Sequence, residues 1–268
     1  MDTERTDDPA TVTVELVDHV LHIGLNRPHK RNAFDQAMLA ELAAAYGRLE
    51  DDPEACVGVL FAHGKDLTAG LYLAQVAGPI LEGDTSYLDA PAIDPWGLTG
   101  RARTKPIVAA AQGRCLTLGI ELLLASDIRV AANDTTFAQI EVLRGIYPFG
   151  GATIRFTAQT GWGNAMRWML TGDEFNAAEA LRIGLIQESV EPGTQIDRAV
   201  ELAERIAQRA APRGVSATLV SARRALVEGP QAAADALLAD VADLLRSPDA
   251  MEGLQSFLER RPAVFTGR

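Results

Sequence analysis

The 268-residue sequence predicts an α/β fold with a largely parallel sheet, followed by a helical region. Two observations support this fold class. Short apolar runs that suit buried strands alternate with segments at helical spacing through the first two thirds of the chain, which is typical of successive βα units. Helical segments rich in alanine and leucine then follow one another toward the C-terminus. We therefore expect a core over residues 1–196 and a C-terminal helical region over residues 197–268.

The N-terminal part of the core predicts a β-hairpin and then a helix. The segments Thr11–Val17 and Val20–Asn26 are separated by only two residues, which is typical of a hairpin. Pro28 ends this pattern. Asp35 is expected to cap the helix that follows. The apolar residues of that helix recur at helical spacing and are Met38, Leu39, Leu42, Ala43, Tyr46 and Leu49.

Three buried strands are expected in the middle of the core. They are Cys56–His63, Pro106–Gly113 and Ser126–Ala132. A helix, Leu118–Ala125, precedes the third strand, so these strands should pair in parallel. Between the first two strands lies Gln75–Arg103, whose prolines and glycines predict a long, partly helical loop near a site.

From Trp162 onward the pattern is mostly helical. Asn176 and Glu179 have the spacing of a capping box, and Gly184 ends the helix that they begin. A short strand, Leu185–Val190, should follow. The expected helical segments of the C-terminal region are Asp197–Ala211, Val215–Glu228, Gln231–Arg246 and Pro248–Arg260.

Composition and charge exclude several classes of partner. Hydrophobic residues make up 47% of the chain and charged residues 23%, which is ordinary for a soluble globular protein. The formal net charge of −11 argues against nucleic acid or anionic lipid as the main partner. A small polyanion remains possible as a ligand, since a few arginines can outweigh the global field locally.

Targeting signals and metal-binding patterns are not expected either. The acidic N-terminus lacks an apolar segment, so we expect no signal peptide. No apolar run approaches the length of a membrane span, and the cytoplasm is the expected location. Cys56 and Cys115 each lie in an apolar setting that suits a buried, reduced thiol. We expect no metal site, because the histidines lack metal-ligand spacing; they are His19, His22, His29 and His63.

Two strand-to-helix junctions are candidate sites for chemistry. Helices are expected to begin near Leu71, within His63–Gln75, and near Leu118, within Gln112–Asp127. The start of a helix exposes backbone N–H groups, and two such groups from different helices would form an oxyanion hole. Each junction taken alone is also an ordinary feature of an α/β protein.

Two glutamates are the candidate acid–base residues. Glu121 interrupts an apolar run and follows Leu118 by three positions, so the two side chains share a helical face. Glu141 likewise lies beside apolar residues. Either carboxylate alone suits a salt-bridged structural role as well as it suits catalysis.

Several ordered motifs identify a family more specifically. They are LNRPHKRNAF (Leu25–Phe34), DLTAGLYL (Asp66–Leu73), the long stretch Thr104–Ala132, TFAQIEVLRGIYPFGGAT (Thr136–Thr153) and LTGDEFNAAEALRIGLIQESV (Leu170–Val190). In this order and at these separations they resemble the crotonase (enoyl-CoA hydratase/isomerase) family along nearly the whole chain. The resemblance implies a spiral of ββα units and a helical region that assembles homotrimers or homohexamers. It also implies an acyl-CoA substrate in fatty acid metabolism, with no separate cofactor.

The resemblance also implies residue roles. Leu71 and Leu118 would donate backbone N–H groups to the thioester oxygen, and Glu121 and Glu141 occupy the acid–base positions of the family's hydratases. The implied reaction is addition of water to a trans-2-enoyl-CoA. Isomerisation of a double bond, another crotonase reaction, or a catalytically silent acyl-CoA-binding protein remain alternatives. The positions expected to bind the CoA ester are Arg27, Arg31, Ala69, Leu71, Tyr72, Leu73 and Leu118.

The chain departs from the family pattern around the expected oxyanion hole. Leu71 replaces an alanine, Tyr72 an aspartate and Phe149 a glycine, and Thr117-Leu118 replaces the first two residues of a glycine triplet. Main-chain donors tolerate such changes. We therefore expect these residues to alter which acyl groups fit the pocket.

Overall fold

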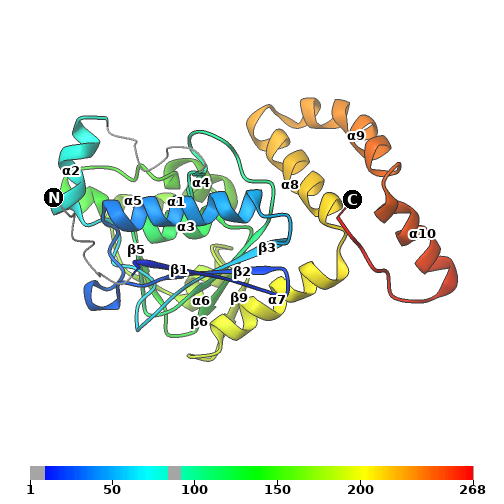
Figure 1. Ribbon diagram of the computed structural model, residues 1–268. Coiled ribbons are helices and arrows are strands. Elements are labelled where there is room, and N and C mark those ends of the chain that lie inside the picture. Colours follow the sequence, from blue (N-terminus) through cyan, green and yellow to red (C-terminus); the bar gives the residue numbers. More distant parts are fainter. Residues whose placement is uncertain (1–9, 84–91, 268) are drawn as a thin grey trace, which may run out of the picture.

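The computed structural model describes residues 10–83 and 92–267. A six-stranded sheet forms the centre of the core (Figure 1). The sheet order is β1-β2-β3-β4-β6-β9. β1 and β2 pair antiparallel, and each later neighbour pairs in parallel. The strands are β1 (Val12–Val17), β2 (Val20–Leu25), β3 (Val57–Ala62), β4 (Ile107–Ala111), β6 (Ile128–Ala132) and β9 (Glu188–Val190).

The predicted hairpin is confirmed as β1 and β2. Asp18 and His19 form its turn, with φ angles of 45° and 68°. Positive φ at both central residues is the requirement of a type I′ turn, whose twist matches that of the flanking strands. The two-residue connection therefore fixes the register in which Val17 faces Val20.

A second, smaller sheet contains β5 (Arg114–Leu116), β7 (Thr136–Ala138) and β8 (Phe175–Asn176). β4 and β6 each lead within a few residues into a strand of this smaller sheet and then into helical turns. The chain thus winds as successive ββα units, as expected. Isolated parallel bridges extend the smaller layer by joining Thr68 to Cys115 and Phe34 to Leu71.

Helices surround both sheets, and two of the predicted caps are confirmed. Asp35 accepts a hydrogen bond from the N–H of Met38 at 3.0 Å, and Asn176 accepts one from the N–H of Glu179 at 2.9 Å. The core helices are α1 (Gln36–Asp51), α2 (Leu73–Leu81), α3 (Leu118–Ala125), α4 (Ala152–Thr160), α5 (Trp162–Thr171), α6 (Ala177–Arg182) and α7 (Gln195–Arg209), with 3₁₀ turns η1 (Pro28–Lys30) and η3 (Glu141–Arg144). Residues 84–91 of the expected long loop lie outside the described residues.

The main sheet buries both of its faces. Leu60 and Ala109 point to the face covered by α1 and α3, whereas Val59 and Val108 point to the opposite face. There they pack with Ala199 and other apolar residues of α7. Strands that are buried on both faces read as continuous apolar runs, which is why the sequence predicts them well.

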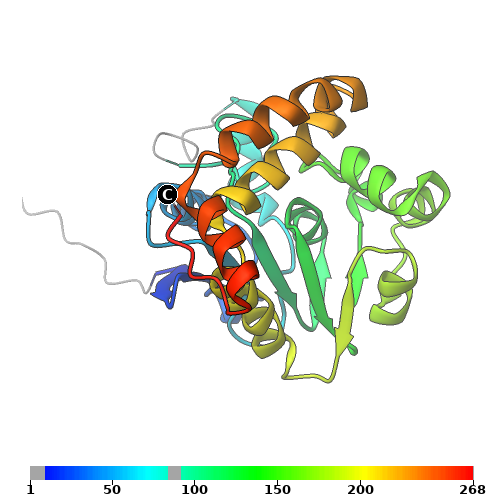
Figure 2. The ribbon, with the colours of Figure 1, turned by 90° about the vertical axis from the view of Figure 1, so that its right-hand side faces the viewer.

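The C-terminal helices α8 (Pro212–Val227), α9 (Pro230–Leu244) and α10 (Pro248–Glu259) extend beside the core (Figures 1 and 2). Since α7 packs on the sheet, the part that leaves the core begins with α8, whereas the boundary expected from the sequence is at residue 197. Within the described residues, no helix is both long and apolar enough to cross a membrane. Large apolar side chains exposed on α8–α10 are Val220, Leu226, Val227, Leu237, Leu238, Val241, Met251, Leu254, Phe257 and Leu258.

Candidate active site

One cavity of about 240 Å³ brings together the residues of both candidate junctions. All four predicted catalytic residues line it, as do Ala69 and Leu73 of the residues expected to bind CoA. A larger cavity, of about 940 Å³, lies between the core and the C-terminal helices, and none of these residues lines it. The smaller cavity is therefore the candidate active site. Its lining is Ala69, Leu71, Leu73, Thr117, Leu118, Glu121, Ile140, Glu141, Arg144, Ile146 and Phe149.

The pairing of two parallel segments places the N–H groups of Leu71 and Leu118 side by side. Thr68 is bridged to Cys115, so Leu71 and Leu118 each follow that bridge by three residues. The next acceptor of a regular ladder would be the carbonyl of Gly70, but that oxygen already accepts the N–H of Phe34 at 2.9 Å. Within the described residues, neither the N–H of Leu71 nor that of Leu118 donates a hydrogen bond. Two free donors thus adjoin one cavity.

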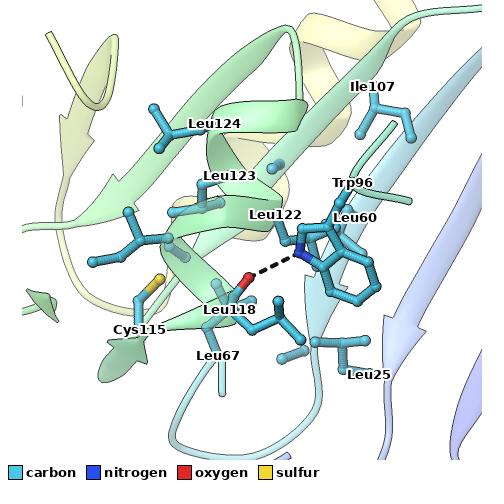
Figure 3. Close-up of a cluster of buried hydrophobic side chains, with 14 of the residues drawn as sticks. Leu25, Leu60, Leu67, Trp96, Ile107, Cys115, Leu118, Leu122, Leu123 and Leu124 are labelled. Atoms are coloured by element: carbon cyan, nitrogen blue, oxygen red, sulfur yellow. Dashed lines mark hydrogen bonds between the residues drawn. The ribbon is translucent and has the colours of Figure 1, made fainter. Parts of the chain in front are cut away.

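The first turn of α3 is held in place by buried neighbours. The indole Nε1 of Trp96 donates a hydrogen bond of 3.1 Å to the carbonyl of Leu118, as Figure 3 shows. The Trp96 ring packs edge-on against Phe34 at 5.5 Å between ring centroids. Gly119 lets Thr68 approach, because a Cβ at Gly119 would lie 2.4 Å from the Thr68 methyl group. These contacts fix the direction in which the Leu118 N–H points.

Glu121 is a buried carboxylate that lies against the backbone N–H groups of Ala152 and Gly150. Its side chain is 1% exposed, and Oε1 accepts the N–H of Ala152 at 3.0 Å. Burial raises the pKa of Glu121 to about 7; the Ala152 N–H opposes this rise, and the nearby charge of Glu141 adds to it. Gly150 permits the close packing here, since a Cβ at that position would lie 2.6 Å from Glu121 Oε2.

Glu141 begins the 3₁₀ turn η3 and is 6% exposed. Its Oε1 accepts a hydrogen bond of 2.9 Å from the side-chain amide of Gln139. Its Oε2 is buried and has no hydrogen-bond partner among the described residues. Burial raises the pKa of Glu141 above its usual range, while its own backbone N–H and Gln139 oppose the rise. A buried carboxylate with one unused oxygen is suited to hold a water molecule or transfer a proton.

Three of the positions expected to bind CoA do not line the cavity. The guanidinium of Arg27 donates to the carbonyl of Ala33 at 2.6 Å and pairs with Asp35 at 3.0 Å. It also lies 6.0 Å from the centroid of the Tyr72 ring. Arg31 is exposed next to this loop, with a φ of 52°. Arg27 therefore stabilises the loop that pairs with the residues around Leu71.

The sequence analysis missed several residues that support this site. Trp96 and Gln139 contact the candidate residues through side chains, and Ala152 and Gly150 do so through the backbone. The paired glycines before Ala152 are a sequence signal for such a close approach. Within the described residues, no group of three or more His, Cys, Asp or Glu side chains is placed to hold a metal ion.

The raised pKa of Glu121 predicts a pH-dependent cost to stability. Its pKa rises from an ordinary 4.5 to about 7, so between these pH values the folded protein binds more protons at this site than the unfolded chain. The contribution of Glu121 to the free energy of unfolding is therefore fully present below pH 4.5 and is lost as the pH rises through 7. Glutamine does not titrate and can still accept the Ala152 N–H.

We expect the stability of Glu121→Gln relative to wild type to increase between pH 5 and pH 8, by up to about 3 kcal/mol. Urea unfolding at both pH values measures this change. Glu174→Gln, on the exposed surface, is the matched control for the substitution itself. A relative stability of Glu121→Gln that is the same at pH 5 and pH 8 would contradict the assignment.

Comparison with known proteins places this fold and site in one family. Residues 15–268 match the family model described as enoyl-CoA hydratase/isomerase. The chain is 34% identical to enoyl-CoA hydratase EchA19 of Mycobacterium tuberculosis over 260 residues, which cover 95% of this chain and 96% of the relative. It is 33% identical to (E)-benzylidenesuccinyl-CoA hydratase of Thauera aromatica over 264 residues, or 96% and 99% of the two chains.

A solved structure agrees with these relatives. The crystal structure of a probable enoyl-CoA hydratase/isomerase from Mycobacterium abscessus superposes with a TM-score of 0.94 at 52% identity, covering 97% of this chain and 100% of that one. The protein therefore belongs to the enoyl-CoA hydratase/isomerase, or crotonase, family. It is an enzyme with a hydratase-like function, and the family predicted from the sequence motifs is confirmed.

Proposed function

We propose that the protein adds water across the double bond of a trans-2-enoyl-CoA. One observation carries the proposal: two free backbone N–H groups and two buried carboxylates line the same cavity. The two N–H groups can donate hydrogen bonds to the oxygen of a thioester, and the two carboxylates can carry out the proton transfers of hydration. The N–H donors come from Leu71 and Leu118, and the carboxylates from Glu121 and Glu141.

The proposed reaction stabilises an enolate between the two amides. The thioester oxygen accepts hydrogen bonds from the N–H groups of Leu71 and Leu118, each contributing about 3 kcal/mol as negative charge develops. Glu121 and Glu141 hold the water and remove one of its protons as its oxygen bonds to C3. The same pair delivers a proton to C2, so the two glutamates return to their starting protonation after one turnover.

The pKa values of the two glutamates support shared proton transfer. Burial raises the pKa of both carboxyl groups, and that of Glu121 reaches about 7, so Glu121 can exchange a proton near neutral pH. One acid and one base are what addition of water requires. No metal or redox group is needed for these steps, and CoA enters as part of the substrate.

We propose that the CoA ester lies along the loop before α2. Ala69, Leu71, Leu73 and Leu118 line the cavity from this side. Tyr72 and the arginines Arg27 and Arg31 lie next to the same loop, where a positive charge favours a phosphate group. The ion pair of Arg27 with Asp35 leaves Arg31 as the freer of the two cations.

Assembly and location complete the proposal. The apolar side chains exposed on α8–α10 favour burial against other copies of the chain, as a homotrimer or a homohexamer. We place the enzyme in the cytoplasm, acting in fatty acid metabolism. The free thiols of Cys56 and Cys115 support a reducing compartment.

The proposed function can be tested by measuring turnover of a series of trans-2-enoyl-CoAs. The series runs from four to about sixteen carbons and includes branched and aryl acyl groups. Leu71, Leu118 and Phe149 line the cavity, and they depart from the smaller residues of the family pattern. The acyl pocket should therefore differ in shape from that of a short-chain hydratase. We expect crotonyl-CoA to be a poor substrate and a bulkier or branched enoyl-CoA a better one. One relative is named for the bulky acyl group of (E)-benzylidenesuccinyl-CoA. Loss of the conjugated-thioester absorbance measures hydration. Equal or faster turnover of crotonyl-CoA would refute the size preference, and no turnover of any member would refute hydration.

A further inference from the structure

Thr117 holds an unfavourable backbone conformation directly before α3. Its φ is 50° and its ψ is −115°, a region that β-branched residues avoid. The surrounding contacts maintain it: the N–H of Thr117 donates to Ala138, and its carbonyl accepts the N–H groups of Ile120 and Glu121. Strain of this kind persists where the fold over-determines it, and such positions cluster at functional sites.

The side chain of Thr117 lies beside the two segments that carry the free amides. A ψ of −115° places Cβ nearly eclipsed with the peptide nitrogen of Leu118. On the other side, Oγ1 lies against Gly70, only 1.9 Å from where a Cβ of that residue would be. Gly70 directly precedes Leu71, so the hydroxyl adjoins both donors of the proposed oxyanion hole. Thr117 also lines the cavity.

The hydroxyl of Thr117 makes no hydrogen bond within the described residues. A hydroxyl has one proton to donate, and an oxygen bound by the N–H groups of Leu71 and Leu118 would lie beside it. We propose that Thr117 Oγ1 is a third donor to the thioester oxygen, strengthening as the enolate forms. This inference rests on the proposed function, because it requires a thioester oxygen at the two amides.

Thr117 could instead act only by filling space against Gly70. Valine separates the two roles, because it keeps the branched shape and loses the hydroxyl. Serine keeps the hydroxyl and loses the methyl group. Thr117→Gly removes both and relaxes the backbone, so it should melt at a higher temperature than wild type while losing activity.

Polarisation of a bound chromophore measures the donors without turnover. A conjugated dienoyl-CoA that accepts hydrogen bonds at its thioester oxygen should absorb at longer wavelength when bound. We expect Thr117→Val to reduce this red shift and to lower kcat by about 10- to 100-fold, with KM and probe affinity within about threefold of wild type. Thr117→Ser should keep the shift, and its kcat should stay within about threefold.

The outcomes separate this inference from the proposed function. A full red shift and unchanged kcat in a folded Thr117→Val would overturn the third donor and leave the two amides in place. A large loss of kcat in Thr117→Ser together with an active Thr117→Val would also overturn it, in favour of space filling. If wild type binds the probe with no red shift, the oxyanion hole itself is refuted, and the third donor with it.

Discussion

Replacement of either Glu121 or Glu141 by glutamine is expected to lower kcat for hydration by at least about 10². Glutamine keeps the shape and the hydrogen-bonding reach of glutamate, but it can neither take up nor deliver the proton. Glu121→Gln can still accept the Ala152 N–H, and Glu141→Gln can still accept the Gln139 amide. Affinity for the acyl-CoA should therefore stay nearly constant, so that the loss appears in kcat.

The double variant and a control make this test sharper. Two residues that act as a unit are not additive, so Glu121→Gln/Glu141→Gln should be little worse than the poorer single variant. Glu174→Gln, on the exposed surface, should retain full activity. An isomerase would tolerate one substitution and lose activity with the other, on a 3-enoyl-CoA. A silent acyl-CoA-binding protein would bind equally well in all forms with no turnover. If either single variant keeps most of the hydration rate, the two-glutamate mechanism is wrong.

Two truncations are expected to affect the protein in opposite ways. Removal of all residues after Gly193 deletes α7, whose Ala199 and Ala203 are fully buried against the main sheet. This exposes an apolar face of the sheet, so we expect insoluble protein. Removal of all residues after Ala211 deletes α8–α10 and the residues that follow them, and it leaves that face covered by α7. We expect this shorter chain to stay folded and to lose the proposed assembly.

Light scattering and circular dichroism at micromolar concentration distinguish these results. The full chain should have the mass of a trimer or hexamer, and the chain ending at Ala211 should have the mass of a monomer with a retained thermal transition. A monodisperse monomer of the full chain would refute the proposed assembly. A chain ending at Ala211 that keeps the mass of the intact oligomer would show that α8–α10 do not mediate it.

Most of the main sheet could be predicted from the sequence, because its strands are continuous apolar runs between clear breaks. The smaller sheet could not. Its strands β5, β7 and β8 are two or three residues long, too short for a periodic pattern, and they are defined by pairing with distant segments. Helix α4 was also missed, since Thr153, Ile154 and Thr157 are β-branched and weaken the helical signal.

The candidate site was predicted in part. Glu121 stands out because a carboxylate interrupts an apolar helix, and the two strand-to-helix junctions pointed to Leu71 and Leu118. The motif resemblance then gave these residues and Glu141 their roles. The register that brings Leu71 beside Leu118 depends on the Thr68–Cys115 bridge, which no local pattern encodes. The contacts of Trp96 and Ala152 join segments far apart in the sequence, so only the folded chain reveals them.

Isotope incorporation tests the proposed hydration most directly. The wild-type protein is incubated with the preferred trans-2-enoyl-CoA in water labelled with ¹⁸O and deuterium, and the thioester is examined by mass spectrometry and NMR. We predict a 3-hydroxyacyl-CoA that carries ¹⁸O at C3 and one deuterium at C2, with formation slowed at least about 10² in Glu121→Gln and Glu141→Gln. Recovery of this enoyl-CoA without ¹⁸O, whether unchanged or with its double bond moved, would contradict the proposed hydration.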